Sequence, residues 1–256
     1  PYLSRGLGDV YKRQVDNDYD LERLEQISTS FNRDLEIMVR FTPGIECHTH
    51  EYIRTGSFDS KFGFGIEYLN ILFDRVSKTK HLKLKGLHAH IGSQIFELDP
   101  HKDLGQIMVS VILDAKKFGH DIQKLNVGGG LGIKYTENDD PPSIDEWVKT
   151  ISTSVVKACK KNNLALPTLM CEPGRSIVST AGITIYKIGS FKEIPGIRTY
   201  VSVDGGMSDN PRPITYQSNY SACLVSNPFN MNSKNKYTIA GCLLYTSPSP
   251  RDRYGS

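Results

Sequence analysis

The sequence predicts an α/β fold: an incomplete (β/α)8 TIM barrel followed by a truncated all-β domain. Apolar runs typical of strands alternate with segments of helical periodicity, which is the pattern of parallel βαβ units. Clusters rich in Gly, His and Asp follow the strands directly, where such barrels build their sites. Five strand ends fall within residues 15–185, against eight strands and roughly 250 residues in a whole barrel. The first barrel strands are therefore expected to be missing.

The predicted barrel strands are short apolar runs, each ended by a polar or glycine-rich turn. The first strand end is recognised at Val15-Asp16. The later runs have the length and apolar content of buried strands. They cover residues 36–41, 84–90, 122–127 and 167–171.

Helices are predicted between these strands. In residues 65–79 apolar residues recur three and four positions apart, which predicts a helix with one buried face. Further helices are expected over about 101–118 and 143–161. Ser143, with Glu146 three residues later, is typical of a capping box that begins the last of these helices.

The domain limits follow from a change of pattern after about residue 182. Residues 183–187 and 198–203 are β-rich, with no clear helix between them. We therefore expect a partial barrel over 15–182 and a partial β domain over 183–241. Residues 1–14 lack the apolar region and cleavage site of a secretory signal, and residues 242–256 have neither strand nor helix period. They are expected to be a non-native leader and tail. The alternative is that they are natural disordered tails.

Composition and charge exclude several classes of protein. The net charge of +3 arises entirely at the ends, because residues 1–14 carry +2 and residues 242–256 carry +1. No basic patch for nucleic acid is therefore indicated. No apolar run approaches the roughly 18 residues of a membrane span. Five Cys without a CxxC pair argue against a disulfide framework, which favours a cytoplasmic protein.

Three consecutive glycines, Gly128, Gly129 and Gly130, follow the strand that ends at residue 127. Glycines allow close backbone approach and can aim N–H groups at an anion such as phosphate. A dinucleotide fingerprint is not indicated, because the third glycine of that motif would fall on Ile133. A purely structural tight turn remains the alternative.

Two histidines, His88 and His90, lie two residues apart on one predicted strand, so both are expected to face the barrel interior. A zinc site would need a third ligand from the loop that holds Cys47, His48 and His50. We predict no metal site. For His88, a satisfied histidine in the core is the simpler interpretation.

The end of the strand at 167–171 carries a carboxylate and a guanidinium, Glu172 and Arg175. Taken alone, this pattern is also that of a common surface ion pair. Residues 203–206 and 209–216 are dense in Gly, Pro, Asn and Asp. That density is equally consistent with turn chemistry alone.

Taken together, these motifs resemble the fold-type III pyridoxal-phosphate decarboxylases, which have the alanine racemase type of barrel. The resemblance rests on four segments in order: HAHIGSQ (88–94), NVGGGLG (126–132), CEPGRS (171–176) and VDGGMSDNPRPITY (203–216). The segment from Cys47 to Phe64 is similar to the signature of the diaminopimelate decarboxylase branch. The resemblance covers nearly all of residues 15–241.

The resemblance implies that pyridoxal phosphate is the cofactor. By similarity, Glu172 keeps the ring nitrogen protonated, since a carboxylate favours a nearby cation. His90 is expected to stack on the ring. Ser93, Gly174 and the three glycines Gly128, Gly129 and Gly130 are assigned to cofactor binding, with the phosphate held by the glycines and Ser93. Arg175 is expected near both phosphate and substrate.

The resemblance also implies the substrate and its contacts. Arg212 suits the far carboxylate of diaminopimelate, because a guanidinium binds carboxylates bidentately. Tyr216 is expected to add a hydroxyl, and Asp204 to contact an amino group. The implied activity is that of a carboxy-lyase of lysine biosynthesis, which converts meso-diaminopimelate to L-lysine and CO2. The implied assembly is a homodimer with shared active sites.

Two family residues are expected to lie outside this chain: the Schiff-base lysine and the acid-supplying cysteine. Lys61 and Cys242 are not assigned these roles, so this chain alone is expected to be inactive. The alternatives are a related decarboxylase acting on ornithine, arginine or carboxynorspermidine, a non-catalytic pyridoxal-phosphate-binding barrel protein, and a metal-dependent barrel hydrolase. The segment from His48 to Phe64 favours diaminopimelate, and the β-rich stretch after residue 182 disfavours a single-domain carrier.

Overall fold

The computed structural model describes residues 14–45, 61–136, 138–215, 218, 220–229 and 237–241. Two compact units are distinguished within them. The first holds the described residues up to Ile133 and those from Asp140 to Ser179. The second holds Lys134–Asp139 and the described residues from Thr180 onward. The sequence suggested a limit after residue 182, whereas the structure divides the chain after Ser179.

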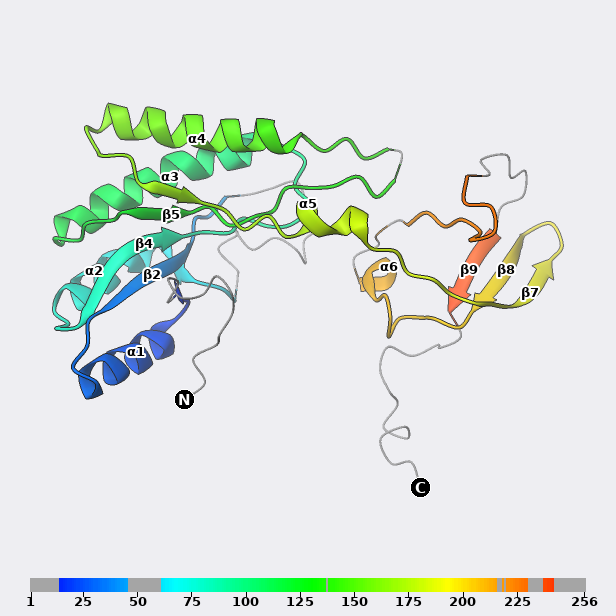
Figure 1. Cartoon of the computed structure of the whole chain (residues 1–256), viewed down its shortest axis with the longest axis horizontal. Coiled ribbons are helices and arrows are strands. Elements are labelled where there is room, and N and C mark those ends of the chain that lie inside the picture. The colour runs from blue at the N-terminus through cyan, green and yellow to red at the C-terminus, as the bar shows by residue number, and fades with distance from the viewer. Residues whose placement is uncertain are drawn as a thin grey trace, which may run out of the picture. The chain divides into compact units, whose positions relative to one another are not determined.

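The first unit is built on a six-stranded sheet in which every pair of neighbours is parallel (Figure 1). The order is β1–β2–β4–β5–β6, with β3 paired to β2. Apart from β3, which pairs only with β2, strands that follow one another along the chain lie side by side, as in βαβ units. The predicted α/β alternation is confirmed. The strands are β1 (Gln14–Val15), β2 (Leu35–Thr42), β3 (Phe64–Gly65), β4 (Leu82–His88), β5 (Lys124–Asn126) and β6 (Thr168–Met170).

The predicted helices are confirmed, with small shifts at their ends. A 3-10 turn over Ile66–Tyr68 precedes α2, so the helix predicted from residue 65 begins at Leu69. The predicted capping box is present: Ser143 Oγ accepts from the Glu146 N–H at 3.2 Å, and Glu146 Oε2 accepts from the Ser143 N–H at 2.9 Å. The helices that join the strands are α2 (Leu69–Ser77), α3 (Asp99–Lys117) and α4 (Ile144–Lys161), and the short α5 (Arg175–Val178) follows β6.

The longest helix that was not predicted is α1 (Asp18–Ser30). Its signals are nevertheless present in the sequence. Asn17 caps it by accepting the Asp20 N–H at 2.9 Å, which is the usual role of Asn at this position. Leu21 and Ser28, one helical repeat of seven apart, are buried. The apolar stripe is weak, because Ile27 and Tyr19 point into solvent.

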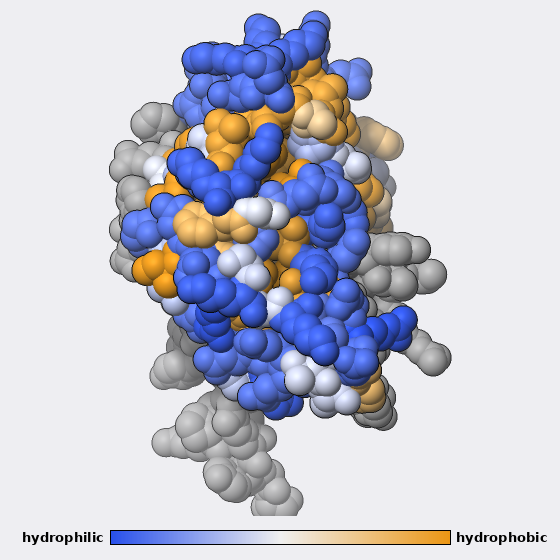
Figure 2. Space-filling model, turned by 90° about the vertical axis from the view of Figure 1, so that its left-hand side faces the viewer, coloured by the Kyte–Doolittle hydropathy of each residue, from blue (hydrophilic) through white to orange (hydrophobic). Residues whose placement is uncertain are grey.

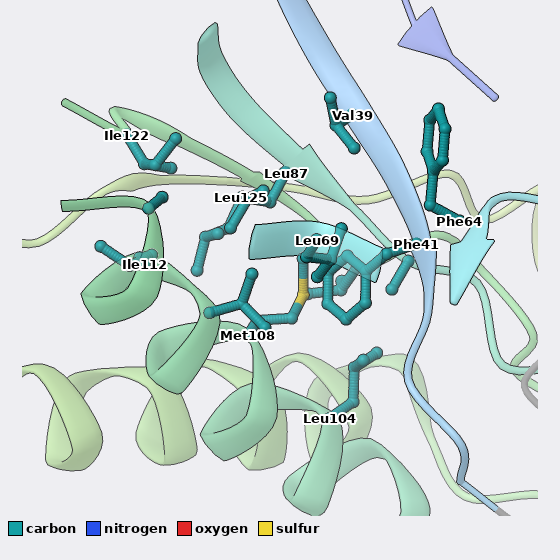
Figure 3. Packing of buried hydrophobic residues seen from close by; sticks show 14 of the residues in the cluster. Val39, Phe41, Phe64, Leu69, Leu87, Leu104, Met108, Ile112, Ile122 and Leu125 are labelled. Carbon is teal, nitrogen blue, oxygen red and sulfur yellow. The ribbon is translucent and has the colours of Figure 1, made fainter. Parts of the chain in front are cut away.

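The core of the first unit lies between the sheet and its helices. Figure 3 shows Leu104, Met108 and Ile112 of α3 pointing toward Leu87 of β4 and Leu125 of β5. All five belong to one cluster of buried apolar residues, to which α2 and α4 also contribute. Burying one such side chain contributes about 1.5–3 kcal/mol. This packing fixes the strands, and with them the loops at their carboxyl ends.

The surface seen in Figure 2 is covered mostly by hydrophilic side chains, with hydrophobic ones visible between them. Among the described residues, no helix is long and apolar enough to cross a membrane.

The second unit contains a three-stranded sheet and a short helix. β7 (Ile188–Ile194) pairs antiparallel with β8 (Arg198–Val203), which pairs parallel with β9 (Tyr237–Gly241); α6 covers Arg212–Thr215. The strand predicted at 198–203 is confirmed. The β-rich segment predicted at 183–187 is not a strand: β7 begins at Ile188 instead. Ile183 and Ile185 belong to no strand and are exposed. Their apolar side chains therefore wrongly suggested a strand at this place.

His101 of α3 is a buried titratable group with an effect on stability. Its ring lies edge-on to Trp147 of α4, with ring centres 5.6 Å apart, and neither ring nitrogen has a hydrogen-bond partner among the described residues. Burial, aided by His90, lowers the pKa of His101 to about 4. The unfolded chain, with an ordinary histidine, therefore takes up this proton at higher pH than the folded chain does.

We expect this histidine to weaken the fold in acid. Between about pH 6.5 and pH 4 the unfolded state binds more protons at His101, so the free energy of unfolding falls as pH falls. The loss at pH 5 is roughly 2 kcal/mol. Urea denaturation should show a smaller loss between pH 7 and pH 5 in His101→Met. His120→Gln, at a histidine that bonds the Phe73 carbonyl at 2.8 Å, should behave like the unchanged chain. Equal slopes in all three proteins would contradict this explanation.

Candidate functional site

A row of side chains crosses the first sheet at the carboxyl ends of its strands. In the strand register Arg40 of β2 lies opposite His88 of β4, His88 opposite Asn126 of β5, and Asn126 opposite Met170 of β6. Partners in register point to the same face of a sheet. The parallel pairing therefore places the Arg40 guanidinium, the His88 imidazole and the Asn126 amide on one face of the sheet. Glu172 comes two residues after Met170, the β6 member of this row.

The Glu172 carboxyl is the centre of this arrangement. Asn126 Nδ2 donates to Glu172 Oε1 at 2.7 Å, and His88 Nε2 lies 3.3 Å from Glu172 Oε2. Asn126 and His88 are buried, whereas the Glu172 side chain is 39% exposed. The Glu172 carboxyl is thus held by two buried groups and remains partly exposed.

The glycine turn that follows β5 packs directly against this carboxyl-bearing segment. The Glu172 N–H donates to the Gly128 carbonyl at 2.7 Å, and the Gly128 N–H donates to Asn126 Oδ1 at 3.0 Å. Gly128 has a φ of +67°, which favours glycine. A Cβ on Gly129 would collide with the Glu172 carbonyl oxygen. Two of these glycines are thus needed for backbone shape and close approach.

His90 joins the same turn from the loop after β4. Its Nδ1 accepts the Gly129 N–H at 3.2 Å, so the neutral ring carries its proton on Nε2. Burial, with smaller effects of Arg40 and His88, lowers the pKa of His90 to about 4. The imidazole is therefore neutral near pH 7. It offers a flat, uncharged face beside the Glu172 carboxylate.

A hollow of about 210 Å³ opens between these loops. Arg175, at the start of α5, donates from Nη2 to Ser93 Oγ at 2.9 Å within it. The hydroxyl oxygen of Ser176 is buried there and has no hydrogen-bond partner among the described residues. The lining residues are His90, Ser93, Gly130, Leu131, Glu172, Pro173, Gly174, Arg175 and Ser176.

Gln94 joins the two loops that form the floor of this hollow, and it was not singled out from the sequence. Its Nε2 donates to the Ile133 carbonyl at 2.7 Å, and its Oε1 accepts the Ile133 N–H at 3.2 Å. The Ile95 N–H donates to the Gly130 carbonyl at 2.9 Å, which extends the same contact. Gln94 has a φ of +59°, a left-handed conformation that is uncommon for Gln. The two-point side-chain contact holds it there.

A second group that the sequence did not reveal is the ion pair of Arg40 and Asp16. Arg40 Nη1 lies 3.4 Å from Asp16 Oδ1, and both side chains are largely buried. Burial lowers the pKa of Arg40, while the nearby carboxylates of Asp16 and Glu172 act in the opposite direction. Arg40 therefore supplies positive charge to the face on which Glu172 lies.

The first unit thus brings together all the residues predicted to bind the cofactor. The predicted substrate residues Asp204 and Arg212 belong to the second unit. Asp204 accepts the Lys187 N–H at 2.8 Å, and the Arg212 guanidinium lies 5.9 Å from the centre of the Tyr135 ring. Tyr216, and residues 47–60 of the predicted loop signature, lie outside the described residues. In the described part of the chain, no cluster of three or more His, Cys, Asp or Glu side chains could hold a metal ion.

Comparison with known proteins gives a consistent set of relatives. The family model for the pyridoxal binding domain of pyridoxal-dependent decarboxylases matches residues 7–179. The diaminopimelate decarboxylase of Synechocystis sp. is 52% identical over 227 residues, which are 89% of this chain and 48% of that protein. That of Staphylococcus aureus is 43% identical over 225 residues, 87% of this chain and 52% of that protein. The chain spans about half the length of these curated relatives.

A solved structure is similar to most of this chain. It is the crystal structure of diaminopimelate decarboxylase from Helicobacter pylori complexed with L-lysine. The TM-score is 0.78 at 28% sequence identity, and the match covers 91% of this chain and 55% of that one.

The glycine turn supplies a direct test of this geometry. In Gly129→Ala the added methyl group meets the Glu172 carbonyl oxygen, so the two segments must separate. We expect the free energy of unfolding to fall by about 1–3 kcal/mol. Gly174→Ala is the matched control, because a Cβ there meets nothing within 4 Å. Thermal or urea unfolding of both variants measures the difference. A Gly129→Ala protein as stable as the Gly174→Ala protein would show that the close approach is not required.

Proposed function

This chain belongs to the family of pyridoxal-dependent decarboxylases, and from that premise we propose that the whole protein removes CO2 from meso-diaminopimelate and forms L-lysine. The family expected from the sequence motifs is confirmed by the match over residues 7–179. Pyridoxal phosphate is the cofactor that this membership implies. The observation that carries the proposal is the Glu172 carboxylate, which is held by Asn126 and opens into the hollow beside His90.

The side chains around the hollow fit pyridoxal phosphate. The cofactor has an anionic phosphate, a basic ring nitrogen and a flat aromatic face. Arg175 supplies a cation, and Ser93 and Ser176 supply hydroxyls, of which that of Ser176 has no hydrogen-bond partner among the described residues. Glu172 supplies the carboxylate and His90 a neutral ring. The site therefore has a matching group for each part of the cofactor.

Each of these residues has a distinct role in the proposal. Glu172 holds a proton on the ring nitrogen, because a neighbouring negative charge favours the protonated form. When bound, pyridoxal phosphate accepts the electron pair that departing CO2 leaves behind. His90, neutral near pH 7, covers the ring face without adding a charge that would compete with that proton. Arg175 and Ser93 hold the phosphate.

The three glycines contribute chiefly by allowing close approach of the backbone. Of the three N–H groups expected to bind phosphate, that of Gly128 is donated to Asn126 and that of Gly129 to His90. Gly128, Gly129 and Gly130 then act by letting the turn approach Glu172 and His90 closely. Gly174 lines the hollow where a side chain would narrow it. The phosphate contacts are left mainly to Arg175 and the two hydroxyls.

Substrate recognition is assigned to the second unit and to Arg175. Diaminopimelate carries an amino acid group at each end, so its far carboxylate requires a cation. Arg212 provides a planar fork suited to that carboxylate. Its guanidinium lies against the Tyr135 ring, which restricts its movement without neutralising it. Tyr216 and Asp204 complete the proposed contacts, with a hydroxyl and a carboxylate for the far amino group.

A homodimer with shared active sites and a cytoplasmic location belong to the same proposal. They follow from the family resemblance and from the composition of the chain. Size-exclusion chromatography with light scattering tests the dimer.

The activity is tested with protein expressed from its complete gene and supplied with pyridoxal phosphate. We expect CO2 and L-lysine in equal amounts from meso-diaminopimelate, and no CO2 from ornithine or arginine. Release of CO2 from ornithine or arginine, with none from diaminopimelate, would assign the protein to another branch of the family. The absence of cofactor binding would overturn the proposal altogether.

Glu172→Gln tests the role of the carboxylate. Gln has nearly the same size but no charge, so the ring nitrogen loses the group that keeps it protonated. We expect cofactor affinity to fall by roughly tenfold, because one charge-assisted contact is lost, and kcat to fall by roughly 10²–10³. Glu97→Gln, at an exposed position, is the matched control. Steady-state kinetics and cofactor titration measure both quantities. An unchanged kcat in Glu172→Gln would refute the assignment.

Arg212→Lys tests whether Arg212 binds the far carboxylate of diaminopimelate. The substitution keeps the positive charge and loses the planar pair of donors, so KM for diaminopimelate should rise. Loss of one charge-assisted contact corresponds to about 1.5–3 kcal/mol in kcat/KM. Arg198→Lys on β8 makes the same chemical change at a residue to which no substrate contact is assigned, and should have no effect. If both variants keep the original KM, Arg212 does not contact the substrate.

A further inference from the structure

A closed circuit of three hydrogen bonds ties the glycine turn to Glu172. The Gly128 N–H donates to Asn126 Oδ1 at 3.0 Å, Asn126 Nδ2 donates to Glu172 Oε1 at 2.7 Å, and the Glu172 N–H donates to the Gly128 carbonyl at 2.7 Å. Asn126 is the only member of the circuit that contributes solely through its side chain. It is also completely buried. No role in the site was predicted for it.

The circuit fixes which way the Asn126 amide points. Its oxygen must face the Gly128 N–H, because only an acceptor satisfies that donor. Its NH2 group then faces Glu172, where it donates to an acceptor. Asp in this place would keep the first contact but set a second carboxylate against Glu172. An apolar residue would lose both contacts.

His88 holds the other oxygen of the same carboxyl. Its Nε2 lies 3.3 Å from Glu172 Oε2, and its Nδ1 is buried with no hydrogen-bond partner among the described residues. A carboxylate oxygen can only accept, so the His88 Nε2 carries a proton in this contact. It donates that proton to Glu172 just as Asn126 does.

The charged and titratable groups that face Glu172 come from several elements. Arg40 lies on β2, His88 on β4, and His90 and Arg175 in the loops around the hollow. Arg40 is itself paired with Asp16. Asn126 and His88 both contact the carboxyl oxygens from the sheet, one on each oxygen. These two contacts constrain the orientation of the carboxyl group.

We propose that Asn126 and His88 are positioning residues that hold the Glu172 carboxylate ionised and aimed at the ring nitrogen of the cofactor. The inference rests on the proposed function, because it requires pyridoxal phosphate in the hollow. Two N–H donors stabilise the charged form of a carboxyl group. Together they also restrict the rotation of the carboxyl group, which lines the hollow.

Asn126→Asp tests the amide donor, with protein expressed from its complete gene. The new carboxyl keeps an acceptor for the Gly128 N–H. In acid it also keeps a proton to donate to Glu172, because a second carboxylate so close disfavours ionisation. As the pH rises this proton is lost. We expect affinity for pyridoxal phosphate near that of the unchanged protein at pH 6, and a loss of roughly tenfold or more at pH 8.5.

The control and a second readout separate positioning from general damage. Asn162→Asp makes the same chemical change at the end of α4, outside the site, so its affinity ratio to the unchanged protein should stay near one at every pH. Amide hydrogen exchange at Gly128 should remain slow in Asn126→Asp, because its acceptor is kept. That measurement does not depend on activity.

A second pair of variants keeps the inference open to refutation if Asn126→Asp does not fold. His88→Gln retains an N–H donor that reaches Glu172, and should bind the cofactor nearly as the unchanged protein does. His88→Leu removes the donor and should lose roughly tenfold in affinity. Equal affinities for these two variants would contradict the role of His88.

The outcomes also distinguish this inference from the proposed function. If the unchanged protein binds pyridoxal phosphate and Asn126→Asp binds it equally well from pH 6 to pH 8.5, the positioning role is wrong and the function stands. If the unchanged protein does not bind pyridoxal phosphate, the proposed function fails first, and the positioning role with it.

Discussion

The register of the parallel strands is the constraint on which the site depends. Arg40, His88, Asn126 and Met170 share one row across β2, β4, β5 and β6. A slip of one residue in any strand would turn its side chain to the opposite face. That face is filled by the apolar side chains that meet α3, such as Leu87 and Leu125 (Figure 3). The same packing that stabilises the first unit therefore sets the polar row.

Burial gives the site its electrostatic character. His90 is neutral near pH 7, because burial lowers its pKa to about 4. Arg40 lies on the same face with its partner Asp16. A neutral ring beside Glu172 leaves the negative charge of the carboxylate for a ligand, whereas a cationic ring there would partly cancel it.

Much of the fold could be predicted from the sequence, because apolar periodicity reflects local packing. The strands at 36–41 and 84–90 and the Ser143 capping box follow this rule. α1 was missed because its exposed Ile27 and Tyr19 blur the stripe. The prediction of a strand at 183–187 was wrong, because an apolar segment forms a strand only where a neighbouring strand can pair with it. The structure places that pairing at Ile188–Ile194.

The site was predictable only in part. His90, Ser93, Glu172 and Arg175 stand in recognisable motifs, and the structure places them around one hollow. The residues behind them could not be found in this way. Asn126 contacts Glu172, which lies 46 positions later in the sequence, and only the pairing of β5 with β6 brings the two together. Gln94 adopts a left-handed backbone conformation, which cannot be predicted from a Gln in the sequence.

The most direct test of this account is a crystal structure of the protein with pyridoxal phosphate bound. We expect the ring nitrogen within hydrogen-bond distance of the Glu172 carboxylate, with Asn126 still donating to that carboxylate. We also expect the phosphate against Arg175 and Ser93. A cofactor bound away from this hollow, or with its ring nitrogen turned away from Glu172, would contradict it.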